Sequence, residues 1–157
     1  MKIHKTNAIR TLDKAHIQYD ILTFDPDEIV VTTETALSLI KKEPCQVFKT
    51  LVTVAKSKQN YVFMLSIEDE LNLKLAASIA NEKSVEMLKS KELLPITGYI
   101  HGGCSPLGMK KLFPKFIDSH ALEFESIICS AGKRGMMIEL DPRELAKLIS
   151  AKFAKLF

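Results

Sequence analysis

The sequence predicts an α+β domain in which a curled, mixed β-sheet is flanked by helices. The length of 157 residues corresponds to about one domain. Hydrophobic residues make up 46% and charged residues 26%, which is enough apolar material for a core without disulfides. Segments with helix and strand patterns follow one another without regular β-α-β alternation. We therefore expect residues 1–157 to fold as one domain.

The first half of the chain alternates helical and extended segments. Amphipathic helices are predicted over 6–18 and 32–41, each beginning at a threonine that can cap it. A short strand is predicted over 19–24. Segment 46–55 is rich in β-branched and apolar residues, which is typical of a strand buried on both faces. Segment 61–67 is expected to return beside it as an antiparallel hairpin.

The second half carries shorter elements and one long loop. We expect helices over 71–80 and 84–91, a loop rich in Gly and Pro over 95–108, strands over 116–118, 126–130 and 136–140, and a tight basic turn over 131–135.

The last element is a helix with strong start signals. Asp141 is its predicted cap, Pro142 occupies the first helical position, and Glu144 completes a capping box. Its expected apolar stripe consists of Leu145, Leu148, Ile149 and Phe153.

Composition excludes several classes of protein. The three cysteines are odd in number and lack CxxC spacing, which argues against a disulfide framework and a zinc site. The N-terminus has no apolar leader and no long apolar run follows, so we expect a cytoplasmic protein without membrane contact. The net charge of +3 permits contact with phosphates but does not demonstrate it. We expect no cofactor, no metal and no DNA partner.

Lys49 lies in the middle of the predicted strand over 46–55. Burying an unpaired ammonium is costly, so the side chain must reach solvent, find a partner or border a cavity. One interpretation is a lysine that extends to solvent from a strand end. The other is an amine at the wall of a pocket, placed to hold an anionic or carbonyl oxygen.

Two further stretches have residue types suited to binding an oxygen anion. Gly102 and Gly103 can point backbone N–H groups at one oxygen, and Ser105 follows them in the same loop. Ser130 ends the predicted strand over 126–130, and Gly132 lies in the basic turn that follows it. Taken alone, each stretch is more typical of a plain turn. Walker, GxGxxG, HExxH and GxSxG motifs are absent.

Taken in order, these stretches resemble the YbaK/EbsC family of aminoacyl-tRNA deacylases. The matching pieces cover nearly the whole chain: residues 5–8, 47–52, 97–99, 102–108, 116–118, 130–135 and 138–140. The resemblance implies the compact fold with a curved, partly barrel-like mixed sheet found in the editing domain of bacterial prolyl-tRNA synthetases. It implies hydrolysis of misacylated tRNA, most often Cys-tRNA(Pro), beside prolyl-tRNA synthetase. We would expect only weak tRNA binding by this protein alone, strongly reduced by salt.

The resemblance also assigns residues. The functional lysine of the family falls on Lys49, and the substrate-binding residues that we expect are Tyr19, Thr50, Gly102, Gly103, Ser105, Ser130 and Gly132. The family is thought to use the thiol of the substrate as the attacking group, which would explain why the sequence shows no catalytic triad. One position departs from the family: a polar residue, commonly aspartate, is often found where this chain has Met137.

Three other interpretations stay open. Met137 is compatible with a deacylase for another mischarged tRNA, such as Ala-tRNA(Pro), with water as the attacking group. A non-catalytic module that binds an aminoacyl or nucleotide ligand would keep the same fold. A hydrolase that uses Cys104 as nucleophile would lose its activity on substitution of that residue.

Overall fold

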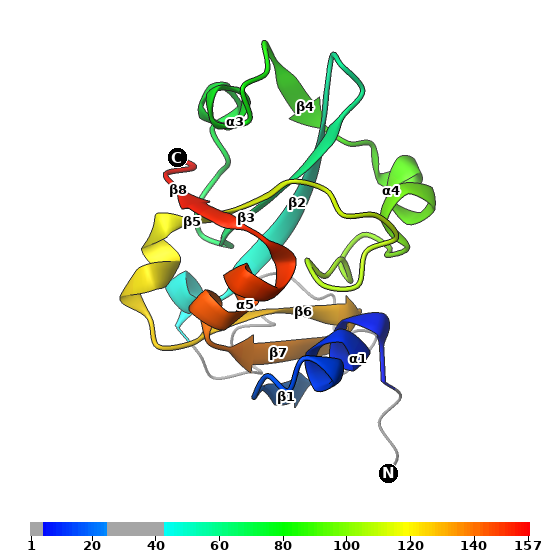
Figure 1. Ribbon diagram of the computed structural model, residues 1–157, viewed down its shortest axis with the longest axis vertical. Coiled ribbons are helices and arrows are strands. Elements are labelled where there is room, and N and C mark those ends of the chain that lie inside the picture. Colours follow the sequence, from blue (N-terminus) through cyan, green and yellow to red (C-terminus); the bar gives the residue numbers. More distant parts are fainter. Residues whose placement is uncertain (1–4, 25–42) are drawn as a thin grey trace.

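The computed structural model describes residues 5–24 and 43–157. It confirms the predicted α+β class: helices pack around two β-sheets (Figure 1). The predicted helix over 32–41 lies outside the described residues. The described helices are α1 (Asn7–Lys14), α3 (Leu73–Ile79), α4 (Ser90–Thr97) and α5 (Pro142–Ile149). The described strands are β1 (Asp20–Thr23), β2 (Phe48–Ala55), β3 (Asn60–Ser66), β4 (Val85–Met87), β5 (Lys115–Asp118), β6 (Ile127–Lys133), β7 (Met136–Leu140) and β8 (Lys152–Ala154).

The strands form two sheets that meet at one point. The larger sheet has the order β4-β2-β3-β5-β8 and is mixed, because β2 pairs antiparallel with both neighbours while β5 pairs parallel with β3 and β8. The smaller sheet, β1-β7-β6, is antiparallel. A parallel bridge between Val47 and Ile128 connects them. The single curled sheet that we predicted is therefore two joined sheets, which do not close into a barrel.

Both terminal helices begin where the sequence predicts. The Thr6 hydroxyl accepts a hydrogen bond from the Ile9 N–H at 3.2 Å, and the Asp141 carboxylate accepts one from the Arg143 N–H at 2.8 Å. Both helices end earlier than expected. The backbone turns left-handed at His16 (φ 58°) and at Ser150 (φ 55°), which stops helical hydrogen bonding.

Three predictions for the second half were wrong in detail. Residues 84–91 were expected to be a helix, but Val85–Met87 pair with the end of β2 as strand β4, and the helix begins at Ser90. Tertiary pairing overrides the weak helical pattern there. Helix α4 continues through Pro95 into the predicted loop. Phe153 lies in β8, not on the last helix.

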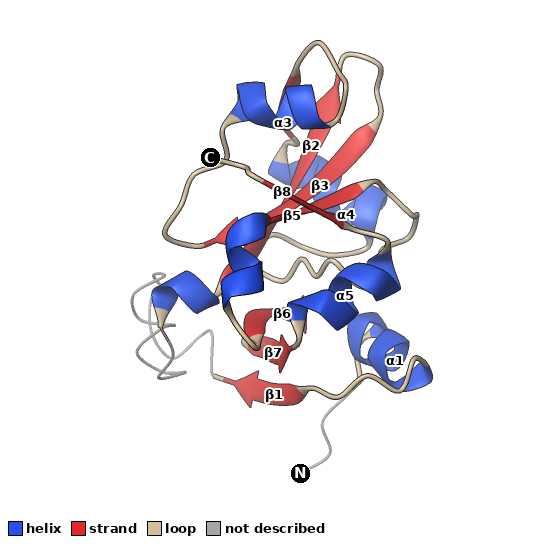
Figure 2. Cartoon of the chain, turned by 60° about the vertical axis from the view of Figure 1, so that its left-hand side comes forward, coloured by secondary structure: helices blue, strands red, loops and turns tan. Residues whose placement is uncertain are grey.

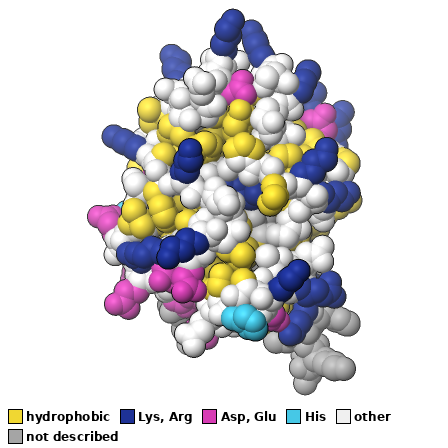
Figure 3. Space-filling model, viewed as in Figure 1, with side chains coloured by type: hydrophobic (Ala, Val, Ile, Leu, Met, Phe, Trp, Pro, Cys, Tyr) yellow, Lys and Arg dark blue, Asp and Glu magenta, His cyan; other side chains and the backbone are white. Residues whose placement is uncertain are grey.

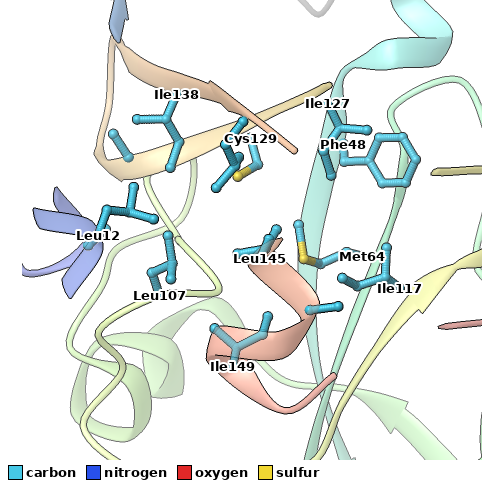
Figure 4. Close-up of a cluster of buried hydrophobic side chains, with 14 of the residues drawn as sticks. Leu12, Phe48, Met64, Leu107, Ile117, Ile127, Cys129, Ile138, Leu145 and Ile149 are labelled. Atoms are coloured by element: carbon cyan, nitrogen blue, oxygen red, sulfur yellow. The ribbon is translucent and has the colours of Figure 1, made fainter. Parts of the chain in front are cut away.

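The main core lies between the two sheets. Phe48, Met64 and Ile117 reach into it from the larger sheet, while Cys129 and Ile138 reach into it from the smaller one (Figure 4). Helix α5 closes this core with Leu145, Ala146 and Ile149, and α1 adds Ala8, Ile9 and Leu12. Helix α3 covers the opposite face of the larger sheet (Figure 2). On that face, the rings of Phe63 and Phe116 stack with their centroids 5.4 Å apart.

Strands β2 and β6 depart from the regular patterns that we predicted. Phe48 and Val52 are buried, but Lys49, Thr50 and Leu51 between them are only half-buried. Strand β6 continues to Lys133 through most of the predicted turn, with a bulge after Ser130. No helix among the described residues is long and apolar enough to span a membrane.

We predict that Asp118→Ala destabilises the fold by about 2–4 kcal/mol, since two buried or half-buried N–H groups lose their acceptor. The buried carboxylate accepts from the Leu156 N–H at 2.9 Å and the His120 N–H at 3.1 Å, which ties β5 to the end of the chain. Urea denaturation measures the change. The exposed Glu125→Ala serves as control and should alter stability by less than about 0.5 kcal/mol. Equal stability of both variants would contradict the assignment.

Candidate functional site

A cavity of about 530 Å³ opens between β2, the β6–β7 hairpin and the start of α4. Its volume is in the range of small-molecule sites. The described residues that line it are Phe24, Val47, Phe48, Lys49, Thr50, Leu51, Val52, Ile67, Met87, Leu88, Ser90, Leu93, His101, Gly102, Cys104, Ser130, Lys133, Gly135, Met136 and Met137. Of the predicted site residues, the cavity brings together Lys49, Thr50, Gly102 and Ser130.

The cavity lies where the described strands leave one edge of β2 open. Strand β4 pairs with β2 only from Thr53 to Ala55, and the bridge to β6 lies at Val47. Between these two points the sheets separate. The segment from Phe48 to Val52 therefore has β3 on one side and the cavity on the other.

Thr50 directs polar groups toward this open edge. In an antiparallel ladder, alternate residues direct their backbone N–H and C=O to opposite sides. The Val47 carbonyl accepts a hydrogen bond from the Ile67 N–H on the β3 side. The Val52 carbonyl accepts one from the Leu88 N–H at 3.0 Å on the opposite side. Thr50 lies two residues before Val52 in the strand, so its N–H and C=O point to the same side as those of Val52, away from β3. Its buried hydroxyl Oγ1 also lacks a hydrogen-bond partner among the described residues. Because buried polar groups are normally satisfied, the hydroxyl without a partner indicates a ligand.

Lys49 is half-buried and lines the cavity. No described carboxylate lies within ion-pair distance of its ammonium. The structure therefore places the lysine at a pocket wall, as one of the two sequence interpretations expected. An unpaired ammonium beside a cavity is suited to holding an anionic or partly negative oxygen.

The β6 bulge positions Ser130. The Gly132 N–H donates to the Ser130 hydroxyl oxygen at 3.1 Å, which leaves the hydroxyl proton available. Gly132 does not line the cavity but is packed against Tyr99: a Cβ there would lie 2.7 Å from Tyr99 Cε1. Its φ of +96° also favours glycine. Gly132 thus supports the site without bordering it.

In the glycine loop, residues 102–105, Gly102 borders the cavity, whereas Gly103 and Ser105 support the loop. Gly102 borders the cavity, and its N–H has no partner among the described residues. The Gly103 N–H is occupied, since it donates to the Ile100 carbonyl at 3.0 Å, and the residue packs closely against Lys133 and Arg134. The buried Ser105 hydroxyl accepts from the Leu107 N–H at 3.2 Å. Neither Gly103 nor Ser105 lines the cavity.

Tyr19 is not brought to the cavity either. Its hydroxyl donates to the Asp13 carboxylate at 2.7 Å, and its ring packs against the main core. Burial and the nearby carboxylate raise the pKa of Tyr19 to about 12. A role for this tyrosine in substrate binding stays a prediction.

Cys104 lines the cavity as a thiol. Burial raises its pKa to about 11, although a hydrogen bond with Thr97 acts in the opposite direction. At neutral pH only about one molecule in 10,000 would carry the thiolate. A cysteine nucleophile needs the opposite environment, with nearby positive charge and a lowered pKa. The raised pKa therefore disfavours Cys104 as the attacking group.

Comparison with known proteins gives the family. A model of the family described as "Aminoacyl-tRNA editing domain" matches residues 27–148. The chain belongs to this editing-domain family. The family, the enzyme class of aminoacyl-tRNA deacylases and the fold that the sequence resemblance implied are thereby confirmed.

Relatives agree with this assignment. The chain is 41% identical over 152 residues to "Putative Cys-tRNA(Pro)/Cys-tRNA(Cys) deacylase EbsC" of Enterococcus faecalis, covering 97% of this chain and 93% of that protein. A solved structure described as a putative trans-editing enzyme for prolyl tRNA synthetase superposes with a TM-score of 0.80 at 23% identity, covering 96% and 97% of the two chains. The hypothetical protein APE2540 gives a TM-score of 0.87 at 19% identity, covering 96% and 99%. The two structures share the fold.

The sequence did not predict several of the residues that line the cavity. Met87, Leu88 and Ser90 come from the segment that was expected to be one helix. Phe24 and His101 lie in or beside turns and belong to no motif. Their only sequence signal is proximity to recognised stretches, such as the position of His101 next to Gly102.

We predict that Gly132→Ala destabilises the protein more than Gly98→Ala. Both glycines have positive φ, which costs an L-residue about 1–2 kcal/mol. At Gly98 the new Cβ would meet only the flexible Lys110 side chain at 3.3 Å, whereas at Gly132 it would meet the buried Tyr99 ring. Overpacking should add about 1–3 kcal/mol at Gly132. Thermal denaturation of the two variants tests this, and equal losses would refute it.

We also predict that Cys104→Ala retains deacylase activity close to that of wild type, because the protonated thiol is not the nucleophile. The measurement is the initial rate of ester hydrolysis at neutral pH. A loss greater than about a hundredfold in a variant that remains folded would instead assign the attack to Cys104.

Proposed function

We propose that this protein hydrolyses Cys-tRNA(Pro) in the cytoplasm, acting in trans as one editing domain over residues 1–157. The observation that carries the proposal is the cavity itself: it offers unpaired groups for a polar ligand but no activated nucleophile among its described lining residues. The name of the 41% identical relative supports the substrate. The name of the trans-editing neighbour supports action beside prolyl-tRNA synthetase.

The attacking group is the thiol of the substrate. Its sulfur forms a bond to the carbonyl carbon of the same cysteinyl ester, and the bond from that carbon to the ribose oxygen breaks. The leaving ribose hydroxyl receives the proton that the thiol loses. Water then opens the resulting thiolactone to free cysteine. A thiol with an ordinary pKa of about 8.5 supplies enough thiolate near neutrality for this step.

The protein contributes position and charge. Lys49 contacts the substrate through its ammonium, while the Gly102 N–H and the Ser130 hydroxyl face the ester oxygen. The open edge at Thr50 offers a carbonyl to the α-amino group and a donor to a second oxygen. Holding thiol and carbonyl together favours an attack that is already intramolecular. Donors fixed in a cavity stabilise the developing oxyanion.

Met137 supports a second candidate, hydrolysis of Ala-tRNA(Pro) by water. Its thioether lines the cavity together with Met87 and Met136, so this part of the wall is apolar. An apolar wall accepts alanine as readily as cysteine, since hydrophobic pockets discriminate weakly between close analogues. Only the attacking group then separates the two candidates.

We predict that the purified protein releases cysteine from Cys-tRNA(Pro) much faster than alanine from Ala-tRNA(Pro) or serine from a matched seryl ester, because only cysteine brings a thiol. The measurement is the decay of each radiolabelled ester at neutral pH. Lys49→Ala should lower the rate on Cys-tRNA(Pro) by about 10²–10³-fold, the size expected for removing one stabilising donor. Equal rates on the cysteinyl and alanyl esters would favour water as the attacking group.

Thr50→Val is the sharper companion variant. Valine has nearly the shape of threonine and removes a buried hydroxyl that lacks a partner among the described residues. Stability should therefore stay equal or rise, whereas the deacylation rate should fall. A structural role would lower stability together with rate. If both stay unchanged, Thr50 is not a substrate contact through its hydroxyl.

A further inference from the structure

Exposed cations surround α4 and the mouth of the cavity. We call this set the α4 basic surface; it comprises Lys89, Lys91, Lys110, Lys111, Lys133 and Arg134. None of the six has an ion-pair partner among the described residues. Unpaired cations on one surface create a positive potential that attracts an anionic partner.

The surface runs from the cavity to the far end of α4. Ser90 and Leu93 at the start of the helix line the cavity, and so does Lys133. The eight residues of α4 span about 12 Å. At the far end, the Lys110 N–H donates to the Thr97 carbonyl at 3.1 Å, and its ammonium lies 3.4 Å from the Pro95 carbonyl. Cations are thus held at both ends of this path.

Acidic residues are scarce along the same path. From Leu93 to Ile117 the chain contains no Asp or Glu, and Glu86 and Glu92 are the only acids from 83 to 117. Figure 3 shows Lys and Arg side chains along the edge of the molecule where α4 lies, whereas acidic side chains gather mainly toward the opposite, lower left side. The modest net charge of +3 therefore conceals an uneven distribution.

We propose that the α4 basic surface binds the backbone phosphates of the acceptor arm of the substrate tRNA. This inference rests on the proposed function. If the aminoacyl ester occupies the cavity, the attached 3′ strand must leave through the mouth, and its phosphates pass over neighbouring protein. The cations beside Ser90 and Lys133 meet the first phosphates, and those beside Thr97 meet phosphates further along the strand.

An RNA partner fits this surface better than a protein partner. Exposed apolar side chains lie here as well, with Leu94 and Ile100 each 50% exposed and Leu112 92% exposed. Such residues suit either partner. The unpaired cations decide between them, because every RNA segment carries phosphates whereas a protein would need a matching acidic surface.

The test compares two triple variants on two substrates. Lys89→Gln/Lys91→Gln/Lys111→Gln removes three cations whose side chains make no hydrogen bond in the described structure. Lys147→Gln/Lys152→Gln/Lys155→Gln removes three exposed cations in or beyond α5 and β8, the strand at the opposite edge of the larger sheet from β4. The substrates are cysteinyl-tRNA(Pro) and the cysteinyl ester of adenosine, which lacks the phosphates.

We expect the Lys89→Gln/Lys91→Gln/Lys111→Gln variant, called the α4 variant, to have a higher KM for the tRNA substrate and an unchanged kcat. It should hydrolyse the adenosine ester with the same kcat and KM as wild type. The slope of log(kcat/KM) against log[salt] should become less negative by about 2–3, since each phosphate contact contributes about 0.7–0.9 to that slope. The control variant should behave like wild type in every respect.

Other outcomes overturn the proposal. An unchanged KM and salt dependence in the α4 variant, or an equal change in the control, would remove the RNA assignment. An effect that appears only when prolyl-tRNA synthetase is present would make the surface a protein interface. Failure of wild type to hydrolyse either ester would instead refute the proposed function, so the two failures are distinguishable.

Discussion

The central constraint of the structure is the single bridge between Val47 and Ile128, after which the two sheets separate. Because β4 joins β2 only from Thr53 onward, a short piece of β2 has no strand from the described residues on one side. An exposed strand edge would ordinarily invite pairing with another chain. Here the edge faces a cavity bordered by α4 and the β6–β7 hairpin, so the Thr50 hydroxyl, which has no partner among the described residues, is available to a small ligand.

Close packing behind the cavity keeps it in shape. Tyr99 is buried between the glycine loop and the β6 bulge, and its hydroxyl donates to the Leu107 carbonyl. Gly132 and Gly108 lie so near this ring that a Cβ at either would clash. Tyr99 thereby holds the glycine loop beside the bulge of β6, so that Gly102 and Ser130 line the same cavity. Glycines that looked like binding residues serve partly as packing residues.

The chemistry suits an enzyme that leaves the nucleophile to its substrate. Burial raises the pKa of Cys104 to about 11, which favours the protonated thiol at neutral pH. On the proposed mechanism, Lys49 and Thr50 would hold and polarise the substrate, and neither would need to exchange a proton. Selectivity on this mechanism follows from the chemistry of the amino acid more than from the tightness of the pocket, which is compatible with a wall that contains three methionines.

The sequence by itself determined the α+β class, the helix caps at Thr6 and Asp141, and the family, because caps, hydrophobic periods and motif order are local properties. It also singled out Lys49, Thr50, Gly102 and Ser130, which line one cavity. It could not separate Gly103, Ser105 and Gly132 from them, since turn residues and ligand-binding residues share the same amino-acid types. Only the tertiary structure decided that residues 85–87 pair as a strand, and that α4 with its cations borders the site. The physical reason is that strand pairing, cavity walls and charge distribution depend on contacts between distant segments, whose free energies exceed the weak local preferences of each segment.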